Sequence, residues 1–226
     1  MNDRVPIRCS QLSAFDPSNW NDVRAAFAQA VELPLMQSWQ ALPNDRFQPG
    51  LVRAGWNADA LWVLAELDDR AITGSESGFN TPAFLTGDAF EIFVRPAGQA
   101  AYCEFHVTPF NGQLQLRYPD AASVELVRKG VAEGIADPFA PFKVERELFE
   151  SWTNIDSERT RWDVLARIPF ASMTEAQGVT MPSRLDASFC RYDYTPGIRE
   201  LVISSTSPHR APNFHCQEEW AELVLV

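Results

Sequence analysis

The sequence predicts an all-β fold, an antiparallel β-sandwich of roughly ten strands with one or two short helices. Many short segments alternate apolar and polar residues, turn residues separate them, and few stretches show a helical period. A chain of 226 residues, 46% of them hydrophobic, is long enough to bury a large core as one unit. We therefore expect a sandwich over residues 31–226, with residues 1–30 as an N-terminal lead-in packed on it.

The N-terminal part contains the first helix candidate. Residues 16–30 carry Ser18 and Asn19, either of which can act as a helix N-cap ahead of a weak apolar stripe. An irregular lead-in is the alternative. From residue 31 onward strand patterns dominate, and residues 31–42 are typical of a strand interrupted by Pro34, which favours an edge or bulged strand.

Two hairpins are predicted by alternation on both sides of a turn. The first joins residues 52–56 to residues 61–67 through a polar turn. The second joins residues 102–107 to residues 114–118 through Asn111-Gly112, because Asn-Gly between alternating runs is the strongest short hairpin signal.

The rest of the chain divides into loops, short helices and further strands. Residues 68–86 form a long loop rich in Asp, Gly, Ser and Asn, and loops of this length are usually functional or disordered. Residues 121–128 fit a strand or a short helix, and residues 171–176 fit one helical turn. Further strands are predicted at residues 142–149, 162–168, 187–194, 201–205 and 223–226.

The strands at 87–94 and 102–107 are the most informative part of the sequence. One face of each is apolar: Phe90, Ile92 and Val94, and Cys103, Phe105 and Val107. The opposite faces carry Glu91, Phe93 and Arg95, and Tyr102, Glu104 and His106. A face that combines aromatic rings with a few polar groups is typical of a ligand site. The alternative is a solvated outer face, or one salt-bridged to Arg95 or Arg191.

Composition narrows the classes of partner. The formal net charge of −11 at pH 7 argues against nucleic acids and anionic membranes, because both bind to basic patches. No stretch approaches the roughly 20 apolar residues that span a bilayer. The first six residues show no signal peptide, which predicts a cytoplasmic location, or an extracytoplasmic one if a leader has been removed. Four scattered cysteines form no zinc motif.

Four segments, in order along the chain, carry a resemblance to a known family: residues 54–69, 87–93, 162–169 and 214–223. Residues 87–93 read Gly-Asp-Ala-Phe-Glu-Ile-Phe, which is similar to the Asp-x-x-Glu-Ile-Phe signature of carbohydrate-binding module family 9. Residues 162–169 resemble the E-x-x-I-P strand of the same family. Over about residues 31–226 the chain thus resembles family 9 and the wider DOMON-like β-sandwiches.

The resemblance implies a sugar site with named positions. Sugar-binding members hold a terminal sugar unit between two tryptophans, bond its hydroxyls from the sheet, and often bind calcium. Glu91 stands where a family glutamate contacts the sugar, and His106 stands where an arginine does. Neither tryptophan is present: Phe84 and Phe79 are the aromatics nearest the first position, and Ser204-Ser205 occupies the second.

The leading hypothesis is non-catalytic binding of a saccharide or polyol on the concave sheet face. The predicted ligand-binding residues are Glu91, Glu104, His106, Tyr102, Arg191 and Phe84. Carboxylates accept hydrogen bonds from hydroxyls, and a neutral imidazole can donate or accept. The alternative from another class is a structural or protein-interaction module that has kept the fold without the sugar site.

Three further hypotheses concern a metal site, an internal ion pair and an enzymatic activity. Calcium is the candidate ion, with Asp68, Asp69 and Asp88 as candidate ligands, although turn capping is the favoured role of Asp88. Arg191 shares a face with Asp193, which favours an internal ion pair over a ligand clamp. An enzyme is less expected; a glycoside hydrolase using two carboxylates is the least unlikely activity, and no G-x-S-x-G elbow is present.

Overall fold

A computed structural model describes residues 6–74, 78–173 and 181–226 of the chain. Within these ranges the elements are, in chain order, β1 (Ile7–Gln11), α1 (Trp20–Ala26), β2 (Glu32–Pro34), β3 (Gly50–Asn57), β4 (Ala60–Asp68), β5 (Ala89–Pro96), β6 (Tyr102–Val107), β7 (Gln113–Tyr118), α2 (Val124–Ala132), β8 (Glu150–Ile155), β9 (Arg161–Pro169), β10 (Arg184–Asp193), β11 (Val202–Ser205) and β12 (Ala221–Leu225). None of the helices in the described ranges is long and apolar enough to cross a bilayer.

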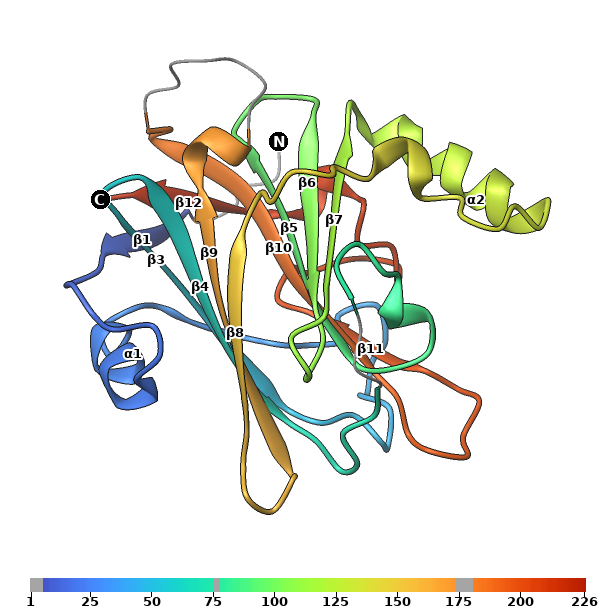
Figure 1. Ribbon diagram of the computed structural model, residues 1–226, viewed down its shortest axis with the longest axis horizontal. Helices are drawn as coiled ribbons and strands as arrows, with labels where there is room; N and C mark the ends of the chain where they lie inside the picture. Colours follow the sequence, from blue (N-terminus) through green and yellow to red (C-terminus); the bar gives the residue numbers. More distant parts are fainter. Residues whose placement is uncertain (1–5, 75–77, 174–180) are drawn as a thin grey trace.

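The strands form two layers joined at one edge (Figure 1). One layer runs β7-β6-β5-β10-β12, with β11 paired to β10, and the other runs β8-β9-β4-β3, with β2 paired to β3. Strand β1 pairs in parallel with both β12 and β3, so the predicted lead-in contributes a strand to the sheets. The other pairings between described strands are antiparallel, and the predicted all-β sandwich is confirmed.

The main core lies between the two layers. Phe90, Ile92 and Phe105 from one layer meet residues such as Val63 and Val164 from the other, all fully buried. Burying one side chain of this size stabilises the fold by about 1.5–3 kcal/mol, which is why the alternating pattern of β5 and β6 fixes their orientation. The predicted apolar faces of these two strands are therefore confirmed.

A second apolar cluster covers the opposite face of the β5–β6–β7–β10 layer, which we call the outer face. The sheet contributes residues such as Phe93 and Leu116, and the cover comes from α2, the 3₁₀ turn Ala140–Phe142 and the loop of residues 206–220 before β12. Trp220 and Phe214 of that loop are buried in this cluster. Much of the outer face is therefore covered by these segments and is not open to water.

Local signals predicted several elements correctly. The Asn19 side chain caps α1, accepting a hydrogen bond from the backbone N–H of Asn21 at 3.1 Å. Both predicted hairpins are present, and Asn111 takes the positive φ of 59° that its tight turn requires. Residues 121–128, left open between strand and helix, fall in a 3₁₀ turn and the start of α2.

Other predicted elements differ. The prediction of a strand over residues 142–149 is wrong. There, where a strand would pair with a neighbouring strand, the backbone groups hydrogen-bond to the side chain of Gln115. Its amide donates to the carbonyls of Val144 and Arg146 at 2.6 Å and accepts from the N–H of Leu148 at 2.9 Å. The strand begins only at residue 150.

Three further segments differ in part from the prediction. Of residues 36–42, only Met36 pairs with a strand, through an isolated bridge to Ser205. The helical turn expected at 171–176 corresponds to the 3₁₀ turn Phe170–Ser172, and residues 174–176 lie outside the described residues. The loop of residues 68–86 contains a 3₁₀ turn, Ala83–Leu85, and its residues 75–77 also lie outside the described part.

Candidate functional site

The outer face carries three buried polar side chains at its centre, on neighbouring strands. In the antiparallel β5–β6 pair, Glu91 lies directly opposite His106. Glu104 is two residues before His106, so both side chains leave β6 on the same face. The prediction that Glu91, Glu104 and His106 share a face is confirmed.

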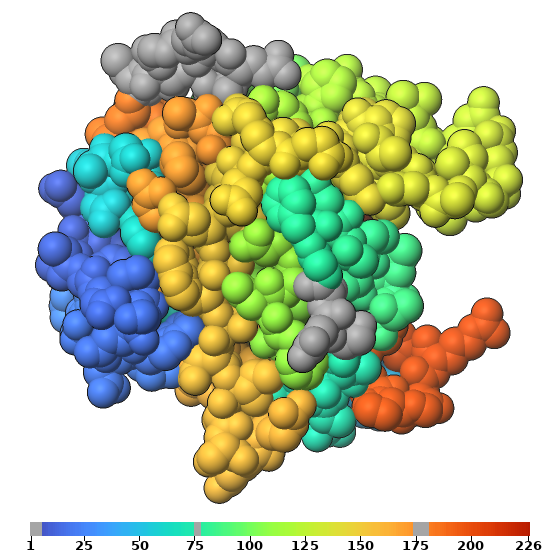
Figure 2. All heavy atoms as spheres, viewed as in Figure 1, coloured from blue at the N-terminus to red at the C-terminus, as the bar shows by residue number. Residues whose placement is uncertain are grey.

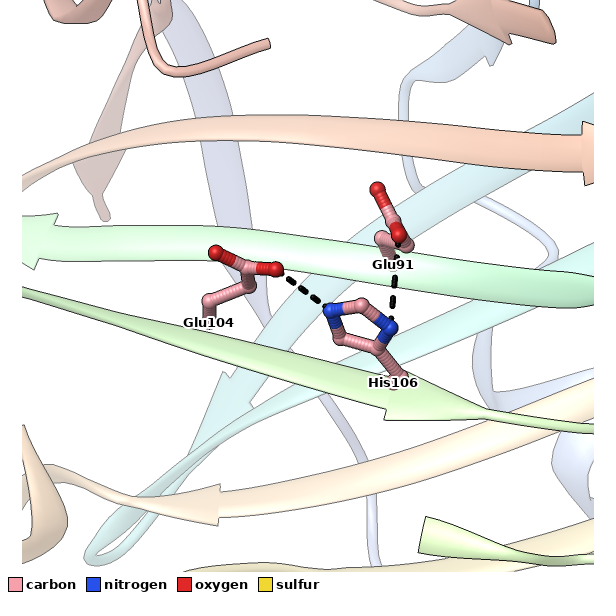
Figure 3. A group of neighbouring side chains, drawn as sticks. All are labelled: Glu91, Glu104 and His106. Atoms are coloured by element: carbon pink, nitrogen blue, oxygen red, sulfur yellow. Dashed lines mark hydrogen bonds and ion pairs between the residues drawn. The ribbon is translucent and has the colours of Figure 1, made fainter. Parts of the chain in front are cut away.

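The imidazole of His106 lies between the two carboxylates (Figure 3). Its Nε2 atom is 2.5 Å from Glu104 Oε1, and its Nδ1 atom is 3.3 Å from Glu91 Oε1. All three residues are at most 4% exposed. The alternative of a solvated face, or one salt-bridged to arginine, is therefore wrong: Arg95 pairs with Asp186 instead.

The hydrogen-bonding capacity of this cluster is not exhausted. Glu104 Oε2 and His106 Nδ1 are buried and have no hydrogen-bond partner among the described residues. An unpartnered acceptor in a protein interior costs about 1–3 kcal/mol, more if it is charged. Such atoms are unusual in a native fold unless something outside the chain satisfies them.

His215 extends the cluster, and the sequence reasoning missed it. Its Nδ1 atom is 3.8 Å from Glu104 Oε2 and 2.8 Å from the hydroxyl of Tyr102. Burial raises the pKa of Tyr102 well above its usual value, so the hydroxyl stays protonated, and it shares a hydrogen bond with Nδ1. Tyr102 thus orients His215 from beneath. The only available signal was that His215 lies in the 214–223 segment of the family resemblance.

Burial and mutual charge set the protonation of the cluster. Burial raises the pKa of Glu91 to about 8; the charge of His106 opposes this shift, and the charge of Glu104 adds to it. Burial acts in the same direction on Glu104, but the hydrogen bond from His106 and the charges of His215 and His106 outweigh it and lower its pKa. Burial lowers the pKa of His106, yet the two carboxylates overcome it and raise the value.

A cavity of about 260 Å³ opens over these groups. Glu91 and Glu104 contribute to its lining, together with the aromatic side chains Phe84, Phe93, Tyr118, Phe139, Tyr192 and Phe214. Helix α2 and β11 supply further lining residues, among them Val127 and Ile203. In Figure 2, α2 and the turn between β10 and β11 project from the same side of the molecule, with the segment around Ala83–Leu85 between them.

The ring of Phe84 lies beside the polar cluster. Its ring centroid is 4.8 Å from that of His106 and 5.5 Å from that of Tyr192. The hydroxyl of Tyr194 donates to the Phe84 carbonyl at 2.8 Å, which holds the turn in place. Phe84 is half-buried, whereas Phe79, the other aromatic that the sequence offered, is 41% exposed and does not line the cavity.

Arg191 does not join this site, which corrects the prediction. In the β5–β10 pairing Cys190 lies opposite Glu91 and Arg191 lies opposite Phe90, so Arg191 points away from the outer face. Its Nη2 atom is 2.9 Å from Asp69 Oδ2 and 3.5 Å from Asp193 Oδ2. The internal ion pair with Asp193 that the sequence favoured is present.

The predicted calcium ligands mostly have partners within the chain. Asp88 accepts backbone N–H groups of Thr73 at 2.5 Å and Tyr194 at 2.7 Å, so the turn-capping role is confirmed. Asp68 is exposed, and its backbone carbonyl accepts from Arg191. Donor atoms of Asp69, Asp88 and Asp193 lie within 4.8 Å of one another, but Asp69 and Asp193 already pair with the Arg191 guanidinium and Asp88 accepts backbone N–H groups.

The donors of Glu91, Glu104 and His106 are equally close, within 4.8 Å of one another. Each imidazole nitrogen already faces a carboxylate, so an ion bound here would have to displace one of these contacts. Calcium takes six to eight oxygen ligands, more than these carboxylates provide. The arrangement in hand is that of a hydrogen-bonding cluster.

A second histidine cluster lies beneath the 206–220 loop. Ser188 Oγ is 3.2 Å from His209 Nε2, and His209 Nδ1 is 3.1 Å from Glu219 Oε2. The sequence contains no G-x-S-x-G elbow, and nothing in its local pattern predicts that these three residues meet. All three side chains are at most 5% exposed, and Ser188 also contacts Ser205 at 3.0 Å. A substrate has no access to this serine, so we assign the trio to anchoring the loop on β10.

Comparison with known proteins settles the family. Residues 21–226 match the sequence profile of the carbohydrate family 9 binding domain-like family. The chain belongs to this family. A search of curated proteins finds no match.

Solved structures share the family 9 fold across nearly the whole chain. A candidate carbohydrate-binding protein from Bacteroides uniformis ATCC 8492 superposes with a TM-score of 0.70 at 13% identity, covering 99% of this chain and 100% of that one. A family 9 module from Caldicellulosiruptor kristjanssonii, in complex with cellotriose, gives 0.65 at 14% identity, with 98% and 93% covered. The same organism's module in complex with glucose gives 0.62 at 13% identity, with 98% and 96% covered.

Proposed function

We propose that this chain binds a carbohydrate non-catalytically, in the cavity over Glu91 and Glu104. The observation that carries the proposal is the buried, unpartnered Glu104 Oε2 beside an aromatic-lined cavity. A sugar hydroxyl is a donor of the right size for such an acceptor. Family membership and the fold shared with sugar-bound modules of Caldicellulosiruptor kristjanssonii support the same conclusion.

In this proposal, polar groups of the cavity bind the sugar hydroxyls and aromatic rings contact its C–H face. Glu104 Oε2 and the Glu91 carboxyl face ring hydroxyls, and His106 and Tyr102 hold these acceptors and His215 in position. The C–H face of the sugar packs on rings such as Phe84 and Tyr192. At about 260 Å³ the cavity is smaller than the ~300–1,000 Å³ of typical drug-sized sites, so it accommodates one terminal sugar unit rather than a chain.

A glycan array followed by titration calorimetry tests the proposal. The expected result is binding to glycans with a matching terminal unit, weakened at least tenfold by Glu104→Ala because the acceptor is removed. Glu158→Gln, at an exposed carboxylate in the turn between β8 and β9, is the matched control and should bind like the wild type. Thermal unfolding of each variant verifies that it is folded.

The same experiment separates the other functions. An array without hits, obtained with folded protein, contradicts carbohydrate binding and favours a structural or protein-interaction module. Turnover of chromogenic glycosides by the wild type, lost in Glu104→Ala, contradicts the non-catalytic part of the proposal and points to a hydrolase.

A further inference from the structure

The polar end of the cavity presents acceptors with few uncommitted donors. Two carboxylates, Glu91 and Glu104, line it, and each nitrogen of His106 already faces one of them. Glu104 Oε2 has no hydrogen-bond partner among the described residues. A ligand that meets this end must therefore supply hydrogen-bond donors.

Near neutral pH the cluster also contains more potential negative charges than positive ones. His106 brings at most one positive charge to two buried carboxylates. His215 adds none near neutral pH, because burial, and to a smaller extent the charges of Arg128 and His106, lower its pKa. Arg128 lies at the outer part of the cavity, about half exposed, and already pairs with Glu125 and with Asn213 at 3.1 Å. With both carboxylates ionised, the buried end of the cavity is therefore one cation short.

Aromatic rings surround this electron-rich end. Phe84, Tyr118, Tyr192 and Phe214 all line the cavity. An ammonium group near the face of such a ring is attracted by the negative face of the π-system, and more strongly when water is excluded. Carboxylates flanked by aromatic rings are thus suited to an organic cation, which combines three N–H donors with a positive charge.

We propose that the preferred sugar carries a free amine, so that the cavity selects an amino sugar over the neutral sugar of the same ring and rejects a uronic acid. The ammonium donates to Glu104 Oε2 and to the Glu91 carboxylate. N-acetylation removes the charge and two of the three donors, so the acetylated sugar behaves as a neutral one. This inference rests on the proposed carbohydrate-binding function.

Binding of an ammonium is coupled to a proton. Near neutral pH the unliganded Glu91 retains a proton, because burial raises its pKa. An ammonium beside it stabilises the carboxylate, so Glu91 releases that proton to solvent as the sugar binds. The complex forms from ammonium and protonated carboxyl, and one proton leaves, so that charge balances. Uptake of a neutral sugar involves no such release.

Titration calorimetry with four probes tests this inference: glucosamine, glucose, N-acetylglucosamine and glucuronic acid. Glucosamine should bind at least tenfold more tightly than glucose or N-acetylglucosamine, and glucuronic acid should bind weakest. Repeating the glucosamine titration in buffers of different ionisation enthalpy should show release of up to one proton per sugar. Equal or tighter binding of glucose, or the absence of proton release with glucosamine, overturns the amine preference while carbohydrate binding stands.

Failure of all four sugars, together with an empty glycan array, would instead contradict the proposed function itself. A variant sharpens the distinction. Glu104→Gln keeps the shape of the side chain but loses its charge, so it should weaken glucosamine more than glucose and bring the ratio of their dissociation constants toward one. Glu158→Gln should preserve the wild-type ratio. An unchanged ratio in folded Glu104→Gln also contradicts the inference.

Discussion

Two buried charged clusters lie on opposite faces of the β5–β10 layer, and they differ in how their carboxylates are satisfied. On the inner side, Asp69 and Asp193 face the guanidinium of Arg191, and Asp88 accepts two backbone N–H groups. On the outer side, Glu91 and Glu104 share the imidazole of His106 and leave an acceptor unpartnered beside a cavity. Among the described residues, the inner carboxylates all have partners and the unpartnered atom is a donor, Arg191 Nε, whereas on the outer side the unpartnered atoms are Glu104 Oε2 and His106 Nδ1. The proposed ligand would meet the outer acceptor, Glu104 Oε2.

The choice of cation accounts for much of the difference. An arginine is always charged and presents five N–H donors in a fixed fork, which suits a permanent structural pair. A histidine has two ring nitrogens, and its charge depends on its surroundings. The charge of the outer cluster around His106 can therefore change when a charged group binds, whereas the permanent charge of Arg191 serves to stabilise the fold.

The largest expected effect comes from breaking the inner cluster. Arg191→Met leaves Asp69 and Asp193 buried without their cation, and removing one partner of such a pair costs about 3–5 kcal/mol. Chemical denaturation should show this fall in the free energy of unfolding. Arg128→Met, at an ion pair with Glu125 in which both side chains are about half exposed or more, is the control and should cost less than about 1 kcal/mol. A loss at Arg191 no larger than at Arg128 would contradict the structural role.

Alternation predicted the composition of the outer cluster, but not its burial. The two-residue period of β5 and β6 places Glu91, Glu104 and His106 on one face whatever surrounds them. The segments that cover this face include α2 and the 206–220 loop. Both are distant in sequence from β5 and β6, and their local sequence does not indicate where they pack. A sequence reading could therefore not tell a solvated face from a covered one.

The predicted site wrongly included Arg191 and omitted His215, and the two errors have related causes. The face that Arg191 occupies relative to Glu91 depends on the β5–β10 register, and a one-residue slip would reverse it. His215 reaches the cluster from a loop without periodicity, held by the hydroxyl of Tyr102. Both are set by tertiary packing, as is the strand that Gln115 displaces at 142–149.

The next effect concerns the pH dependence of stability, and it is specific to the outer cluster. Because the pKa of Glu91 rises from 4.5 to about 8 in the folded chain, the folded state holds a proton that the unfolded state has lost across this range. The free energy of unfolding should therefore fall as pH rises from about 4.5 to 8. Glu91→Gln removes this contribution, which is at most about 1.4 kcal/mol per pH unit.

Denaturation of wild type and Glu91→Gln at several pH values between 4.5 and 8 measures this slope. The variant should show the shallower decline, with its stability relative to wild type greatest at pH 8. Glu158→Gln controls for loss of an exposed carboxylate. Parallel slopes for wild type and Glu91→Gln would show that folding does not raise the pKa of Glu91, which would contradict the proton release expected when an ammonium binds.

The smallest effect should come from the aromatic wall, and it separates binding from folding. Phe84→Ala removes the ring that lies 4.8 Å from His106 on a half-buried turn, so it should weaken sugar binding about tenfold, or ~1.4 kcal/mol. Its effect on the free energy of unfolding should be smaller than that of Arg191→Met. Phe79→Ala, on the same segment but outside the cavity lining, should leave calorimetric affinity unchanged. Equal losses of affinity in both variants would mean that the turn, and not the ring over the polar cluster, supports the sugar.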